Sequence, residues 1–79
     1  MNLNETIKNS KELEFAVFCV ENVAIKLGIS AEMVYRALTE KSDILNGYII
    51  PEYGMLHTQS KEYIVNDIIE VMKERGVNL

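Results

Sequence analysis

The sequence predicts an all-α fold: a small domain of three main helices with an irregular apolar connection between the second and the third. Three observations lead to this prediction. Apolar residues recur at steps of three and four in three segments, which is the period of an amphipathic helix. A serine, threonine or asparagine that can cap a helix precedes each segment, and a glycine follows the first and the last. Finally, 48% apolar and 25% charged residues are typical of a globular protein.

The first helix is predicted between Ser10 and Gly28. Asn9 and Glu12 have the spacing of a capping box, and Ser10 is an equally good cap. Gly28 takes the left-handed conformation that ends a helix, and Ile29 follows as the usual apolar contact. Apolar side chains cover more than half of the circumference, so we expect this helix at the centre of the bundle. They are Leu13, Phe15, Ala16, Val17, Phe18, Cys19, Val20, Val23, Ala24, Ile25 and Leu27.

The other two main helices have clear limits as well. The second is predicted from its cap, Ser30, to about Lys41, and the third begins after Thr58 or Ser60 and closes at Gly76. The second helix is expected to bury Met33, Val34, Ala37 and Leu38. The third is expected to bury Ile64, Val65, Ile68, Ile69 and Met72.

The connection over residues 42–57 allows two interpretations. Asn46 and Gly47 between apolar residues are a hairpin signal, but Pro51 interrupts the second arm. The alternative, which we favour, is a short helical turn from Ser42 that Gly47 stops. An extended stretch imposed by Pro51 would then follow.

Composition and charge limit the possible roles. Residues 1–9 lack a clear period and are predicted to be a loose N-terminal arm, and residues 10–79 a single helical domain. The net charge of −4 gives an acidic surface that repels nucleic acid and anionic membranes. The sequence has no apolar run long enough to span a bilayer, and its first residues are not a secretory signal. Cys19 is the only cysteine, so a reducing, cytoplasmic location is expected.

Residues 24–38, AIKLGISAEMVYRAL, resemble a helix–turn–helix motif. The spacing lets two helices cross at a tight glycine turn, and nothing in it requires DNA. A recognition helix here would offer Ser30, Tyr35 and Arg36 to DNA, but its charges cancel, whereas DNA binding needs a basic face. A helical corner is therefore favoured, with a DNA-binding regulator as the alternative.

Few side chains could carry chemistry. Cys19 lies on the apolar side of the first helix and is predicted to be a buried core residue. His57 is the only histidine, so one histidine and one cysteine do not make a metal-ligand set. The sequence contains no glycine-rich phosphate loop and no nucleophile elbow. We expect no catalytic residue, no bound metal and no cofactor.

The segment from Tyr48 to Leu56 is more apolar than a connecting loop needs to be, and its tyrosines suit an interface. It could cover the open side of the core, bind a partner, or do both. The following stretch, residues 56–59, is expected at a helix N-terminus, where free N–H groups could hold an anion. The candidate interaction residues are Tyr48, Pro51, Tyr53, Leu56, His57, Thr58 and Gln59.

The stretches ELEFAVFCVENVAIKLGIS, VYRAL and YIIPEYGMLHTQSKEYIVNDIIEVM resemble a family of small, uncharacterised bacterial proteins classed only as a domain of unknown function. The resemblance covers about residues 12–75. Some proteins encoded beside members of that family look like ADP-ribosyltransferase-type toxins. The resemblance therefore implies a cytoplasmic accessory or antitoxin-like role, and it brings no functional residues with it.

These observations together predict a non-enzymatic, cytoplasmic module for protein–protein interaction. Its partner would be another protein or a second copy of the chain, because a domain this small gains stability by association. Nucleic acid and membranes are not expected as partners, and a helix–turn–helix DNA-binding regulator remains the alternative function.

Overall fold

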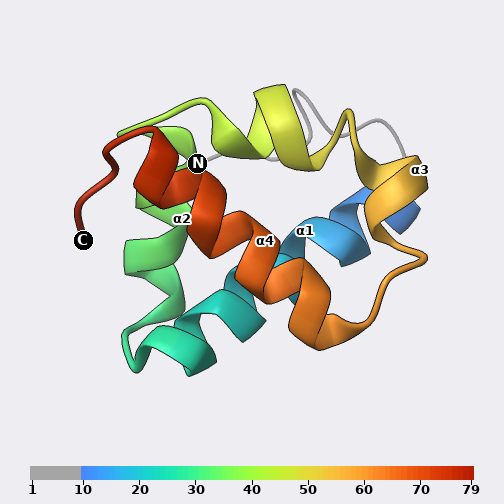
Figure 1. The fold of residues 1–79 in the computed structure, drawn as a ribbon, viewed down its shortest axis with the longest axis horizontal. Coiled ribbons are helices and arrows are strands. Elements are labelled where there is room, and N and C mark those ends of the chain that lie inside the picture. Colours follow the sequence, from blue (N-terminus) through green and yellow to red (C-terminus); the bar gives the residue numbers. More distant parts are fainter. Residues whose placement is uncertain (1–9) are drawn as a thin grey trace.

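Three long helices and two short helical segments form the computed structural model, which describes residues 10–79 (Figure 1). The long helices are α1 (Ser10–Leu27), α2 (Ala31–Thr39) and α4 (Lys61–Glu74). The π-helix η2 (Leu45–Ile49) and the short α3 (Tyr53–Leu56) lie between α2 and α4. Residues 10–79 contain no strand, which confirms the all-α prediction. The predicted arm of residues 1–9, with the cap Asn9, lies outside the described residues.

The N-terminal ends of α2 and α4 follow their sequence signals. Ser30 Oγ accepts a hydrogen bond of 3.2 Å from the Met33 N–H, and Ser60 Oγ accepts one of 3.1 Å from the Tyr63 N–H. Each serine thereby satisfies a backbone donor that the helix itself leaves without an acceptor. Of the two caps proposed for α4, Ser60 is the one used.

Glycine ends both α1 and α4. Gly28 has a φ of +70° and Gly76 a φ of +68°, a region that other residues enter only with strain. After Gly28, the Ile29 N–H donates to the Ala24 carbonyl at 3.1 Å, and Val77 makes the same backward bond of 2.9 Å after Gly76. Both ends are therefore Schellman motifs, as the glycine positions predicted.

The long helices form a frame that the connecting segment, residues 44–56, closes. Helix α1 packs against both α2 and α4, and α2 also contacts η2. In Figure 1, α4 crosses in front of α1, α2 stands at the left, and the connection runs along the top to α3 at the right. All five elements contribute buried side chains to the core. The largest fully buried side chains are those of Leu38, Ile44, Leu45, Ile49, Leu56 and Ile68.

The connecting segment is mostly helical, which corrects the prediction of a turn stopped at Gly47 and then an extended stretch. The Ile50 N–H donates to the Leu45 carbonyl at 3.0 Å, the i→i+5 bond of a π-helix. Ile50 keeps helical angles, φ −68° and ψ −47°, directly before Pro51, where extended backbone is usual. The π turn passes through Gly47 without a break.

Burial of apolar side chains explains this path. Ile44 and Ile49 are both 0% exposed, and a helical path directs both of them into the core. A hairpin would require a positive φ at Gly47, but the positive-φ glycines of residues 10–79 are Gly28 and Gly76. The hairpin alternative is therefore wrong as well.

Two expectations about burial are also wrong. Helix α1 packs against both other long helices, as expected, but its apolar circumference is not buried all round, because Val17 is 41% exposed and Ile25 is 76% exposed. Met33 of α2, expected in the core, is 45% exposed. In each case the residue lies beside a buried stripe of its helix, but no other element among residues 10–79 covers that side. Within the described part of the chain, no helix has the length and apolar character needed to cross a bilayer.

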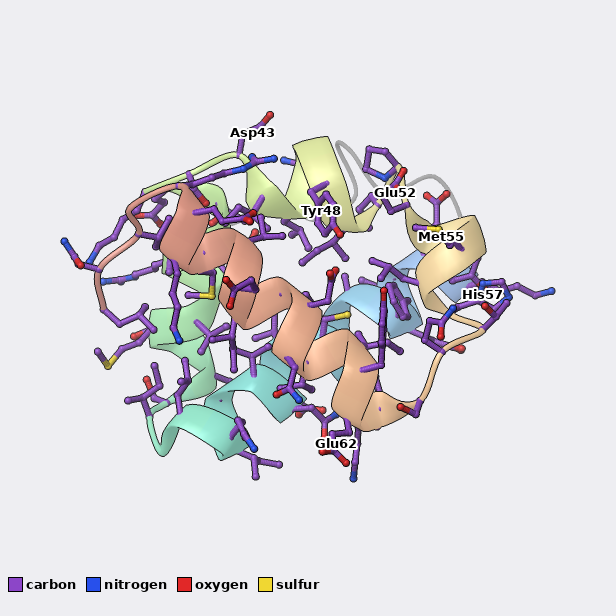
Figure 2. The ribbon with its side chains drawn as sticks, viewed as in Figure 1. Asp43, Tyr48, Glu52, Met55, His57 and Glu62 are labelled. Atoms are coloured by element: carbon purple, nitrogen blue, oxygen red, sulfur yellow. The ribbon has the colours of Figure 1, made fainter. Side chains whose placement is uncertain are left out.

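Alanine at position 47 distinguishes the helical path from a hairpin. Inside a helix, alanine is favoured over glycine by about 1 kcal/mol, whereas a positive φ costs alanine about 1–2 kcal/mol. The new Cβ would lie 2.5 Å from Oδ2 of Asp43, whose side chain points away from the molecule in Figure 2. We therefore expect the double variant Asp43→Ala/Gly47→Ala to resist urea better than Asp43→Ala alone. Lower stability of the double variant would contradict the helical path.

Candidate functional site

Part of the predicted interaction segment covers the core. Ile49 and Leu56 are almost fully buried, and Tyr48 and Tyr53 are partly buried against the same cluster. The Tyr48 hydroxyl donates a hydrogen bond of 2.6 Å to Oδ2 of Asp67 and so connects η2 to α4. This arrangement agrees with the first of the two roles considered for the segment, a cover over the open side of the core.

The hydrogen bond also affects the Tyr48 hydroxyl itself. The bond to Asp67, partial burial of the ring and the nearby negative charges of Asp67 and Glu52 together raise the pKa of Tyr48 to about 12. The neutral phenol is the form that donates to the carboxylate. Tyr48 is therefore a structural tie between two elements.

Tyr53 lies between two aromatic rings near the N-terminal end of α1. The Phe15 ring meets it edge-on, with ring centroids 5.3 Å apart, and the His57 ring stacks on it at 4.5 Å. His57 Nδ1 lies 2.7 Å from the Tyr53 carbonyl oxygen, to which it donates when it carries the proton. These contacts fix α3 against the start of α1.

The anion site considered at residues 56–59 is not formed. The N–H groups of His57, Thr58 and Gln59 donate to the carbonyls of the α3 turn, and the Thr58 hydroxyl donates to the Met55 carbonyl at 2.7 Å. These donors are therefore already used, and the N-terminus of α4 lies beyond them at Ser60.

Another part of the predicted segment is exposed. Pro51, His57, Thr58 and Gln59 face solvent, and beside them Met55 is 55% exposed. In Figure 2, Met55 and His57 lie together at one end of the molecule. Binding of a partner by these residues stays a prediction.

The residues considered for DNA contact are divided among different tasks. Ser30 uses its hydroxyl as the α2 cap, Tyr35 is partly buried against the core, and Arg36 is exposed. The exposed acidic residues Glu32 and Glu40 lie on the same short helix. DNA binding stays a prediction. Of the three residues considered for it, only Arg36 presents an exposed positive charge that could contact DNA.

Cys19 is fully buried, as predicted, and burial raises the pKa of its thiol to about 12. The nucleophilic thiolate is thereby disfavoured. Residues 10–79 contain no group of three or more histidine, cysteine, aspartate or glutamate side chains that could hold a metal ion.

A groove between α1 and α2 is a surface feature that the sequence did not reveal. It has a volume of about 310 Å³, and we refer to it as the α1–α2 groove. Its lining consists of Ala16, Val17, Val20, Glu21, Ala31, Glu32, Tyr35 and Leu45. A second hollow of about 510 Å³ shares Glu21 and Ala31 with it and continues along α1 past Ala24 and Ile25 to Ile29.

The exposed side of α1 borders both hollows. Val17, Glu21 and Ile25 are spaced four apart, so they lie on one face of the helix, and all three are exposed. Helical spacing alone predicts Val17 and Ile25 for the apolar, buried side of this helix. It does not show which side of α1 stays uncovered by the other elements.

A family model described as a protein of unknown function (DUF3791) matches residues 14–75. The chain belongs to this family. The match confirms the resemblance to a domain of unknown function, and it includes every residue that lines the α1–α2 groove. No curated protein and no solved structure matches the chain.

Replacing Tyr48 tests the tie between η2 and α4. Tyr48→Phe removes the hydroxyl, and we expect it to lower the free energy of unfolding by about 1 kcal/mol at neutral pH. The folded-state pKa, about 12, exceeds the ordinary value of 10.0, so this stabilisation is complete below about pH 10 and is lost as the pH rises through about 12. Urea unfolding of both proteins between pH 7 and 12 should show their difference disappearing.

The matched control for this test is Tyr63→Phe, because the Tyr63 side chain is 50% exposed. Removal of the Tyr63 hydroxyl should leave the stability at neutral pH close to that of the parent protein. Equal effects of the two substitutions would contradict a special role for the bond between Tyr48 and Asp67.

Proposed function

We propose that this protein is a non-enzymatic interaction module that binds another protein in the α1–α2 groove. The observation that carries the proposal is the exposed apolar face of α1. On this face Val17, 41% exposed, lines the α1–α2 groove, and Ile25, 76% exposed, lines the adjoining hollow. Fully burying an aliphatic side chain of this size stabilises a complex by about 1.5–3 kcal/mol. A partner that covers both residues would therefore gain a substantial part of its binding energy there.

The rigidity of the groove supports the same proposal. Its two sides are α1 and α2, which pack against each other and are joined by the Schellman turn at Gly28. Its floor includes Leu45, which is 1% exposed and belongs to the core. A surface that is already ordered loses little conformational entropy on binding, which favours affinity.

The side chains at the groove favour binding over catalysis. Apart from two glutamates and one tyrosine, the lining is aliphatic. The thiol of Cys19, a stronger nucleophile when ionised, lies on the buried side of α1 and has a raised pKa. The side chains of this surface are therefore better suited to binding a partner than to catalysing a reaction.

In its finer form, the proposal is a cytoplasmic accessory or antitoxin-like protein. The sequence resemblance supports this form through the toxin-like proteins encoded beside members of that family. The single, unpaired cysteine also suits a reducing compartment.

Affinity capture from the native cell tests the proposal. The wild-type protein should retain a specific partner, and the double variant Val17→Gln/Ile25→Gln should lose it, because glutamine keeps the helix and the charge but removes the apolar contact. Met55→Gln is the matched control, since Met55 is 55% exposed on α3, outside the groove. Circular dichroism should show all three proteins equally folded.

Two results would count against the groove. If Met55→Gln loses the partner and the groove variant still captures it fully, the binding surface is formed by the exposed residues around α3 and not by the groove. If the wild type and the groove variant retain the same proteins, no partner depends on the groove, and the proposed interaction module is wrong.

A further inference from the structure

We infer that the α1–α2 groove takes a basic amphipathic helix, a partner segment with an apolar stripe flanked by lysine or arginine. The inference rests on the proposed function and adds the chemistry of the partner. It follows from the spacing of the exposed side chains, the sign of the charges around them, and the unfavourable contacts that a second copy of this chain would make.

The shape of the surface favours a helix. Val17, Glu21 and Ile25 form a ridge along α1 that is about 12 Å long at 1.5 Å per residue. Hollows lie beside this ridge on the α2 side, lined by small residues such as Ala31. Ridges and grooves of this kind pack against the side-chain rows of another helix. Because residues 10–79 contain no strand, they offer no sheet edge to an extended peptide.

The charges around the ridge select a basic partner. Among the residues that line the two hollows, the charged ones are Glu21 and Glu32, and both are exposed. Glu14 is exposed one turn before Val17 on the same side of α1. Lysine or arginine beside the apolar stripe of the partner would meet these carboxylates, whereas acidic residues would be repelled.

A second copy of the chain fits this surface poorly. If two ridges paired antiparallel about a twofold axis, Val17 would meet Ile25 of the other copy, and Glu21 would meet Glu21. Each chain also carries a net charge of −4. Because the two Glu21 carboxylates would repel each other, the contact between Val17 and Ile25 alone does not favour a dimer.

Beyond Ile25 the surface changes sign. A third hollow between α1 and α4 is bordered by Ile25, Lys26 and Lys61, together with Glu62. The acidic part of the ridge therefore ends near Ile25. The basic residues of the partner should lie over Glu21 and Glu32, and not over this end of α1.

A synthetic peptide pair tests the inference. The probe is an amphipathic peptide of about 18 residues, or five helical turns, with leucine on one face and lysine beside it. Its counterpart carries glutamate in place of each lysine. We expect the lysine peptide to bind with a dissociation constant below about 100 µM in low salt, measured by fluorescence anisotropy, and the glutamate peptide not to bind.

Variants of the protein locate the binding and separate its two components. Val17→Gln/Ile25→Gln should abolish binding of the lysine peptide at any salt concentration. Glu21→Gln/Glu32→Gln should weaken it about three- to tenfold in low salt, and the loss should shrink at about 1 M salt, where charges are screened over about 3 Å. Lys26→Gln is the control and should not weaken binding.

The outcomes distinguish this inference from the proposed function. If affinity capture yields a partner that depends on Val17 and Ile25, but both peptides bind equally or neither binds, the interaction module stands and the basic helix is wrong. If sedimentation shows a dimer of the protein alone that Val17→Gln/Ile25→Gln dissociates, a second copy occupies the groove and the inference is overturned.

Discussion

The fold depends on burial of the connecting segment, residues 44–56, against the three long helices. Ile44, Leu45, Ile49 and Leu56 are each at most 1% exposed. At about 1.5–3 kcal/mol for each buried side chain, their burial is worth up to about 6–12 kcal/mol. That is comparable to the whole net stability of a small domain. Without this segment, a chain of 79 residues would leave one side of its core in water.

The same constraint decides which surface stays open. The connecting segment covers the core from one side, where Tyr48 reaches Asp67 on α4 and Tyr53 packs on Phe15 of α1. No equivalent segment among residues 10–79 covers the outer face of α1, so Ile25 remains in solvent. The apolar residues that the core requires and those that are free for a partner are therefore separated on the molecule.

Features with local causes could be predicted from the sequence. The caps Ser30 and Ser60 and the terminal glycines Gly28 and Gly76 act through hydrogen bonds within a few residues, and the structure uses all four. Features that depend on packing between distant segments could not. The helical path through Gly47 opposes its local signals, and the groove exists only because of how α1 and α2 meet. For the same reason, the sequence pattern predicts the binding surface at the tyrosine-bearing segment, and it predicts that Val17 and Ile25 of α1 lie on the apolar side of the helix.

Native-state hydrogen exchange tests most directly whether the connecting segment is part of the core. The amide of Ile50 donates to Leu45 and that of Leu56 donates to Glu52, so both report on this segment. If the segment is integral to the core, both amides should exchange only by global unfolding, at the same free energy as the amides in the middle of α1. Exchange of Ile50 and Leu56 at a much lower free energy, while α1 stays protected, would show a detachable loop and contradict this account.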